Sequence, residues 1–266
     1  MRAPSEGYLI RKVPVGYADL ERGDPGGGQS SRPRARRVAG RSVGADAMTK
    51  RIAIVQGHPD PTERHLLHAL ADAYADGAVA GGHDVRRIEV AKLDFPLLRT
   101  QAEFETGAMP PGLVHARENM RWAEHWLFLF PLWHGTMPAL FKGFLEQIFR
   151  PGFAMEYAKS GFPKRLLAGR SARIVVTMGM PALMYRWYFG AYGVRGFERS
   201  VLSFAGIKPI RESLYGLAFA DERKRARWLE DMRSHGEGAT EPRLRRNVPF
   251  PDFSSIARVP ARLSPK

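Results

Sequence analysis

Residues 51–82 read RIAIVQGHPDPTERHLLHALADAYADGAVAGG and contain two different periods. The first seven residues are a short apolar run with three Ile or Val, which is typical of a strand buried on both faces. From Thr62 onward, apolar residues recur with the helical period, and the pair Gly81 and Gly82 is expected to end the helix. A buried strand followed by an amphipathic helix indicates an α/β domain.

The same alternation continues along the chain. Further strands are expected at residues 84–90, 126–131, 172–178 and 207–215. Further helices are expected at residues 114–123, 138–149 and 221–232. Strands that alternate with helices predict a parallel sheet with right-handed crossovers, and such a sheet binds ligands beyond the carboxyl ends of its strands.

The composition excludes several classes of protein. The hydrophobic content of 44% is enough for a globular core, and the absence of Cys excludes disulfides, thiolate nucleophiles and iron–sulfur clusters. The longest apolar stretch, residues 126–133, is much shorter than the roughly 20 residues that span a bilayer. No cleavable apolar segment follows the N-terminus. We therefore expect a cytoplasmic protein that does not insert into membranes.

The net charge of +14 would by itself suggest a nucleic-acid partner. However, residues 1–47 and residues 233–266 each carry a net charge of +4, so more than half of the excess lies near the two ends. Residues 1–47 are rich in Gly and Pro and lack an apolar period, so we expect a disordered extension, with Met48 as the native start. The domain is then expected at residues 48–235 and an irregular tail at residues 236–266. No nucleic-acid partner is expected, and a basic binding arm at residues 1–47 is the alternative.

The loop at residues 57–65 has the chemistry of a phosphate site. It leads into a helix N-terminus, where free N–H groups and the helix dipole favour an anion. Its side-chain donors are those of His58, Thr62, Arg64 and His65. Alternatively, Thr62 is only the helix N-cap and Arg64 a solvated charge. No recognisable metal-ligand motif accompanies these residues, so no metal site is expected.

Two later loops suggest a flat ligand. After the strand at residues 126–131, Trp133 and His134 offer rings and donors, while Gly135 lets the backbone approach a ligand closely. Trp133 could instead complete the core. After the strand at residues 172–178, Thr177, Gly179 and Tyr185 could line the edge of a planar ring. A planar cofactor that carries phosphate, meaning a flavin, fits the three loops best, since the motifs of NTPases, serine hydrolases and zinc proteases are absent.

Three motifs between residues 51 and 233 resemble the NAD(P)H:quinone oxidoreductases, also called the NAD(P)H dehydrogenase (quinone) or DT-diaphorase family. They are Gly57-His58-Pro59 with Thr62, the stretch FPLWHGTMPALFKGF at residues 130–144, and Thr177 and Gly179 with Met184-Tyr185. The second is the most specific, because a long unbroken stretch agrees in residue type and spacing. The resemblance implies a flavodoxin-like three-layer sandwich with a five-stranded parallel sheet of order 2-1-3-4-5.

The resemblance also implies that FAD or FMN is the cofactor, NAD(P)H the co-substrate and a quinone or related small molecule the acceptor. The cofactor-binding residues would be His58, Thr62, Arg64, His65, Pro131, Leu132, Trp133, His134, Gly135, Thr177, Met178 and Gly179. Tyr157 and Tyr185 would be catalytic and would line a pocket that nicotinamide and quinone enter in turn, which implies ping-pong hydride transfer. A homodimer is implied as well, with residues 185–197 as a candidate contact.

Two departures from the family limit this inference. Glu63-Arg64-His65 stands where eukaryotic members carry Ser-Phe-Asn, which leaves FAD and FMN both open. Ala191 stands where those members carry the His that assists Tyr185, so the same Tyr–His proton relay cannot operate. The alternatives are a regulatory flavoprotein subunit of a potassium-efflux type transporter, and an azo- or nitro-reductase on the same fold. The choice between NADH and NADPH and the physiological acceptor stay open.

Overall fold

The computed structural model describes residues 49–157, 163–219 and 221–239. The expected extension at residues 1–47, the expected start at Met48 and residues 240–266 of the expected tail lie outside the described residues. Residues 236–239 are described, and α7 (Glu222–Glu237) continues beyond the expected helix end at Met232.

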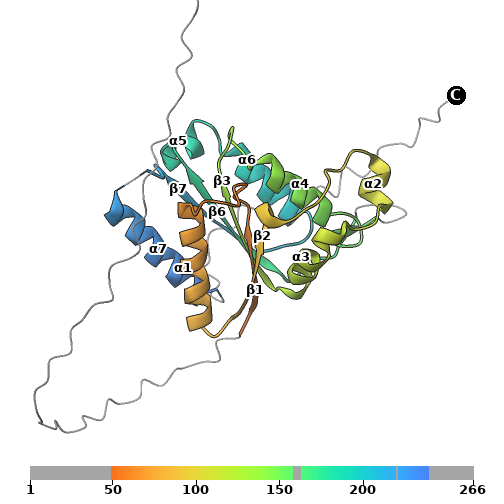
Figure 1. The fold of residues 1–266 in the computed structure, drawn as a ribbon, viewed down its shortest axis with the longest axis horizontal. Coiled ribbons are helices and arrows are strands. Elements are labelled where there is room, and N and C mark those ends of the chain that lie inside the picture. The colour runs from red at the N-terminus through yellow and green to blue at the C-terminus, as the bar shows by residue number, and fades with distance from the viewer. Residues whose placement is uncertain (1–48, 158–162, 220, 240–266) are drawn as a thin grey trace, which may run out of the picture. The chain divides into compact units, whose positions relative to one another are not determined.

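A five-stranded, all-parallel sheet forms the centre of the described residues (Figure 1). Its strands are β1 (Arg51–Gln56), β2 (Asp84–Glu89), β3 (His125–Pro131), β6 (Ser171–Met178) and β7 (Ile210–Gly216). They lie side by side in the order β2-β1-β3-β6-β7. Numbered within the sheet, this is the order 2-1-3-4-5, and the predicted fold class is confirmed.

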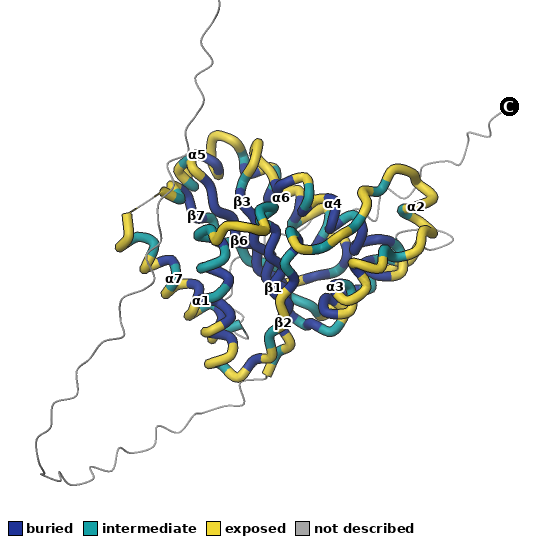
Figure 2. Tube along the Cα trace, viewed as in Figure 1, coloured by how far each residue is buried: buried dark blue, intermediate teal, exposed yellow. Residues whose placement is uncertain are grey.

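Helices cover both faces of this sheet, which gives three layers (Figure 1). One face packs against α1 (Leu66–Ala80) and α7. The other face packs against α3 (Pro111–Trp122), α4 (Ala139–Ile148), α5 (Ala182–Trp187) and α6 (Tyr192–Gly196). Every residue of β3 is buried, as the dark central strands in Figure 2 show, because the helices remove both faces of the sheet from water.

Several short elements were not predicted. They are η1 (Val90–Lys92), α2 (Gln101–Thr106), the antiparallel pair β4 (Met155–Glu156) and β5 (Lys164–Arg165), helices α5 and α6, and a π-helical segment η2 (Phe197–Ser203). Three starts also differ by at least three residues: α1 begins at Leu66 rather than Thr62, α3 (Pro111–Trp122) begins before residue 114, and β7 begins at Ile210, after Pro209. None of the helices in the described ranges combines the length and the apolarity needed to cross a membrane.

The strand order fixes where a ligand would bind. From β1 the chain crosses to β2 on one side, and it returns to add β3 on the other side of β1. The carboxyl ends of β1 and β3 therefore form the topological switch point, where open α/β sheets bind their ligands. Pro131 is in register with Thr177 on the next strand, so the ends of β3 and β6 also lie together.

Candidate functional site

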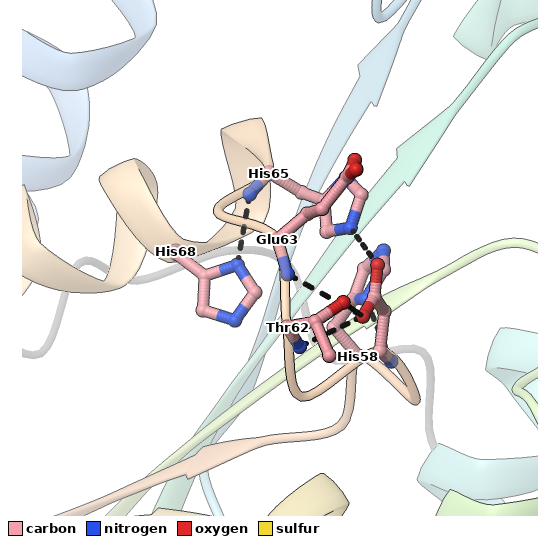
Figure 3. Close-up of polar contacts among 6 residues, drawn as sticks. His58, Thr62, Glu63, His65 and His68 are labelled. Carbon is pink, nitrogen blue, oxygen red and sulfur yellow. Dashed lines mark hydrogen bonds and ion pairs between the residues drawn. The ribbon is translucent and has the colours of Figure 1, made fainter. Parts of the chain in front are cut away.

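The loop after β1 is organised by the carboxylate of Asp60. Figure 3 labels its three partners, Thr62, Glu63 and His65. Its Oδ1 accepts hydrogen bonds from the Thr62 hydroxyl at 2.7 Å, from the Thr62 N–H at 2.8 Å and from the Glu63 N–H at 3.4 Å. Its Oδ2 lies 2.9 Å from Nε2 of His65. These donors, the Thr62 hydroxyl above all, hold the pKa of Asp60 well below its usual range. The loop is therefore a convergent set of donors around an anion, and that anion is a carboxylate of this chain.

The start of α1 corrects one expectation. Thr62 does not cap this helix, because its N–H and hydroxyl both donate to Asp60. The N-cap is His65, whose N–H donates to Nδ1 of His68 at 3.1 Å. The phosphate-type donors consequently belong to a turn that precedes the helix rather than to the helix N-terminus.

His58 lies beside this turn as a neutral donor. Its ring stacks on the ring of His65 with centroids 3.9 Å apart, and its Nδ1 accepts the Asp60 N–H at 3.2 Å. Burial, followed by the charges of His65 and His68, lowers the pKa of His58 to about 4. At neutral pH the proton of the ring is therefore on Nε2, which can donate to a ligand.

A cavity of about 130 Å³ extends from this loop toward β2. His58, Thr62 and Arg64 contribute to its wall, together with Gln56, whose buried Nε2 has no hydrogen-bond partner among the described residues. Arg64 pairs with Asp72 on α1, which also pairs with Arg87. The guanidinium of Arg64 is thus engaged with an acidic side chain, and its predicted contact with a flavin requires that this pair opens.

Asp60, Glu63 and His65 also bring three ligand atoms within 4.8 Å of one another, a spacing that could hold a cation. The acceptor atoms of Asp60 already take part in the hydrogen bonds of the turn, so this grouping has an evident structural role.

The loop after β3 is a tight turn that faces outward. The N–H of Trp133 donates to the carbonyl of Thr136 at 2.9 Å, and the N–H of Thr136 donates back at 3.0 Å. His134 and Gly135 both have positive φ, 47° and 78°, as a type I′ turn requires. Their N–H groups have no hydrogen-bond partner among the described residues. Trp133 is 49% exposed, so it does not complete the core.

Tyr185 lies beneath this turn. Its hydroxyl donates to the carbonyl of Gly135 at 3.0 Å and accepts the N–H of Val194 at 3.4 Å. The side chain is only 1% exposed, and burial raises the pKa of its phenol. This placement differs from the prediction of a pocket-lining tyrosine, because the hydroxyl is already bonded to the backbone of two segments. In the described chain, Tyr185 positions the turn.

The third loop is tied to the second through the backbone. The N–H of Leu132, which follows Pro131 at the end of β3, donates to the carbonyl of Thr177 at 2.8 Å. The side chains of Thr177 and Met178 are buried, whereas Gly179 is exposed at the end of β6. The structure thus brings the three predicted loops to one edge of the sheet. Tyr157 is exposed directly after β4, outside these loops.

Sequence reasoning missed Gln56 and Asp60. Gln56 is a polar residue that closes an apolar strand, and Asp60 lies between two prolines, where an Asp commonly accepts from the backbone two residues ahead. Both signals were present in the sequence.

Comparisons with known proteins agree with this architecture. A family model described as flavodoxin-like fold matches residues 50–235. A ribosyldihydronicotinamide dehydrogenase-like protein of Penicillium crustosum is 26% identical over 178 residues, which cover 57% of this chain and 64% of the relative. FMN-dependent NADH:quinone oxidoreductase 1 of Hahella chejuensis is 30% identical over 113 residues, which cover 42% and 51%. The chain thus spans less than two thirds of these relatives.

Among solved structures, the NAD(P)H:quinone oxidoreductase from Methanothermobacter marburgensis superposes with a TM-score of 0.62 at 18% identity, over 73% of this chain and 99% of that chain. This is a likeness of fold. The names of the curated relatives confirm the resemblance to NAD(P)H:quinone oxidoreductases. Since the family model covers most of the chain and the sheet has the corresponding strand order, the protein belongs to the family with a flavodoxin-like fold.

Proposed function

We propose that this protein is a flavin-dependent NAD(P)H oxidoreductase that reduces quinones or related acceptors. The observation that supports this most is the turn at the end of β3, next to the switch point. It combines the exposed indole of Trp133 with the N–H groups of His134 and Gly135, which no described residue accepts. A flat apolar face beside two donors suits an isoalloxazine ring, whose edge carries hydrogen-bond acceptors.

The residues present fit such a cofactor at its other end as well. The donors around Asp60 already hold a carboxylate, which stands in for the phosphate of a flavin. Thr62 and the neutral His58 would hold the phosphate there, with Arg64 and His65 nearby. Pro131, Leu132, Thr177, Met178 and Gly179 would border the ring, chiefly through their backbone. We favour FMN over FAD, because the Hahella relative is named FMN-dependent.

A bound flavin would supply two-electron chemistry between NAD(P)H and an acceptor. The exposed turn would receive the two substrates one after the other, and a single shared pocket predicts ping-pong kinetics. The N–H groups of His134 and Gly135 would stabilise negative charge on the ring edge. Tyr185 would keep those donors in place, and Tyr157 would line the pocket.

We also propose that the protein acts as a homodimer in the cytoplasm. Trp187 at the end of α5, Tyr188 directly after it and Tyr192 at the start of α6 are all largely exposed, next to the turn that Tyr185 holds. Exposed aromatic side chains in one segment are typical of a protein interface. Light scattering after size exclusion should report two chains per particle, and Trp187→Ser together with Tyr192→Ser should shift it to one.

The central test is the absorbance spectrum of the purified protein and the identity of the flavin that it releases. We expect FMN, and parallel lines in double-reciprocal plots with NAD(P)H and a quinone. Trp133→Ala should weaken flavin binding at least tenfold, whereas Val79→Ala, at an exposed apolar position on α1, should not. A colourless protein that neither FMN nor FAD reconstitutes would overturn the proposal.

A further inference from the structure

A second cavity, of about 150 Å³, lies at the opposite edge of the sheet. Its wall is built from the amino ends of β3, β6 and β7 and from α1 and α7, which lie side by side (Figure 1). One water needs roughly 10–15 Å³, so the cavity has room for a small polyatomic ion and several waters. The 6 residues of β1 separate it from the Asp60 loop by about 20 Å. The two cavities are therefore distinct.

Two buried polar atoms in this wall lack partners. Tyr74 on α1 is 0% exposed, and its hydroxyl has no hydrogen-bond partner among the described residues. His125 on β3 is 6% exposed, and its Nε2 is equally without a partner there, while its Nδ1 lies 2.8 Å from Oγ of Ser171. Unpaired buried polar atoms are costly and rare in folded proteins, so two in one cavity point to a ligand that they contact.

The wall is also strongly cationic. Lys50, Arg173 and Arg211 contribute to it, and none of the residues that line this cavity in the described ranges carries a carboxylate. Arg173 and Arg211 are in register on the neighbouring strands β6 and β7, so their side chains leave the same face of the sheet.

Lys50 and Arg173 each have more N–H donors than their hydrogen bonds to described residues use. Lys50 uses one ammonium proton on the carbonyl of Ala239 at 3.2 Å, and the buried Arg173 donates from Nη1 to the Ser213 hydroxyl at 2.9 Å. Lysine has three such protons and arginine five. Burial, followed by the charges of Lys50 and Arg173, lowers the pKa of His125 to about 3. The ring is neutral at pH 7, and in the tautomer whose Nδ1 accepts from the Ser171 hydroxyl its proton is on Nε2.

We propose that this cavity binds a tetrahedral oxyanion of the phosphate class. Lys50 and Arg173 supply the charge, and the Nε2–H of His125 and the hydroxyl of Tyr74 donate hydrogen bonds. A phosphate dianion offers several acceptor oxygens and satisfies all four groups at once. Because it would join α1, α7 and three strands, its binding should also stabilise the fold.

The test is a calorimetric titration of the full-length protein with inorganic phosphate, in phosphate-free buffer and with saturating FMN, which keeps phosphate out of the Asp60 loop. We expect one phosphate per chain, displaced by sulfate, and a rise in Tm that grows with phosphate concentration. Lys50→Met and His125→Phe should each weaken binding at least tenfold. Arg99→Met removes the same charge at an exposed loop position and should bind as wild type does.

Lys50 lies at the rim, before β1, so Lys50→Met carries the test even if His125→Phe fails to fold. Circular dichroism checks that Lys50→Met and His125→Phe are folded. The proposal is overturned if wild type binds no phosphate at millimolar concentration, or if Lys50→Met binds phosphate as tightly as Arg99→Met. If the protein binds no flavin, the titration is repeated without FMN on the Thr62→Val variant. This substitution alters only the Asp60 loop, so it should leave phosphate binding in the cavity beside His125 unchanged.

Discussion

Asp60 holds the donors that a flavin phosphate would need. Its carboxylate would therefore both compete with a phosphate and repel it. Asp60→Asn removes the charge and weakens the competing acceptor, so we expect FMN to bind about tenfold more tightly. Riboflavin, which has no phosphate, should bind unchanged. Quenching of flavin fluorescence measures both affinities, and equal FMN affinity in the variant and the wild type would contradict the competing role of Asp60.

A substitution at Tyr185 can distinguish whether this residue positions the turn or acts directly on the substrate. Tyr185→Phe removes the hydroxyl that joins Gly135 to Val194, so we expect a loss of about 1 kcal/mol in the free energy of unfolding. Because the displaced turn would serve both substrates, kcat/KM should fall by a similar factor for NAD(P)H and for quinone. A fall for quinone alone would instead mean that the phenol acts on the acceptor. Ser200→Ala, which also removes a hydroxyl but at an exposed position outside residues 185–197, is the control and should change neither quantity.

At the scale of single residues, the sequence predicted which loops form the site. It did not predict which side chains contact each other there. Gly57, Pro131 and Gly135 are local signals of strand ends and turns, so the three loops could be found without a structure. The pair between Arg64 and Asp72 and the burial of Tyr185 depend on tertiary packing, which no local pattern encodes.

Among the elements, α1 and α7 pack closely against each other at glycine positions, of which Gly77 is one. A Cβ at Gly77 would lie 1.9 Å from the carbonyl oxygen of Arg233, so the two helices could not keep their separation. Gly77→Ala should lower the free energy of unfolding by about 1–3 kcal/mol, although Ala normally stabilises a helix relative to Gly. Gly196→Ala, in α6 with open space around it, should be neutral or slightly stabilising. Urea unfolding compares the two, and a Gly77→Ala variant as stable as wild type would contradict this packing.

The elements that the sequence predicted are those with many periodic residues. The five long strands and helices α1, α3, α4 and α7 each repeat their pattern often enough to be recognised. Helices α5 and α6 have 6 and 5 residues, too few to establish a period. The start of α1 was misplaced because Asp60 captures Thr62 in a turn of its own.

For the whole molecule, strand order followed from connectivity, whereas the cationic cavity could not be anticipated. Right-handed crossovers leave few ways to arrange five alternating strands and helices, and they place the ligand edge at the carboxyl ends. Lys50, Arg173 and Arg211 are far apart along the chain and meet only when β1, β6 and β7 enter one sheet. The positive charge of the domain is therefore partly gathered at one site.

The half-buried His58 and the buried His125 make the stability of the whole fold sensitive to acid. Burial lowers the pKa of His58 to about 4 and that of His125 to about 3, against about 6.5 in an unfolded chain. At pH values between 6.5 and the lowered pKa values, the unfolded chain binds more protons than the folded one. The contribution of the two neutral rings to the free energy of unfolding is therefore complete above pH 6.5. It is lost as the pH falls toward 4 for His58 and toward 3 for His125.

For the buried His125, the loss should be on the order of a few kcal/mol. Urea unfolding between pH 7.5 and 5, in phosphate-free buffer, measures it. His125→Phe cannot take up this proton, so its free energy of unfolding should depend less on pH than that of wild type. His115→Gln, at an exposed position on α3, should retain the wild-type slope. Equal slopes for His125→Phe and wild type would show that His125 takes up its proton equally well in the folded and the unfolded chain, and the lowered pKa of His125 would then be wrong.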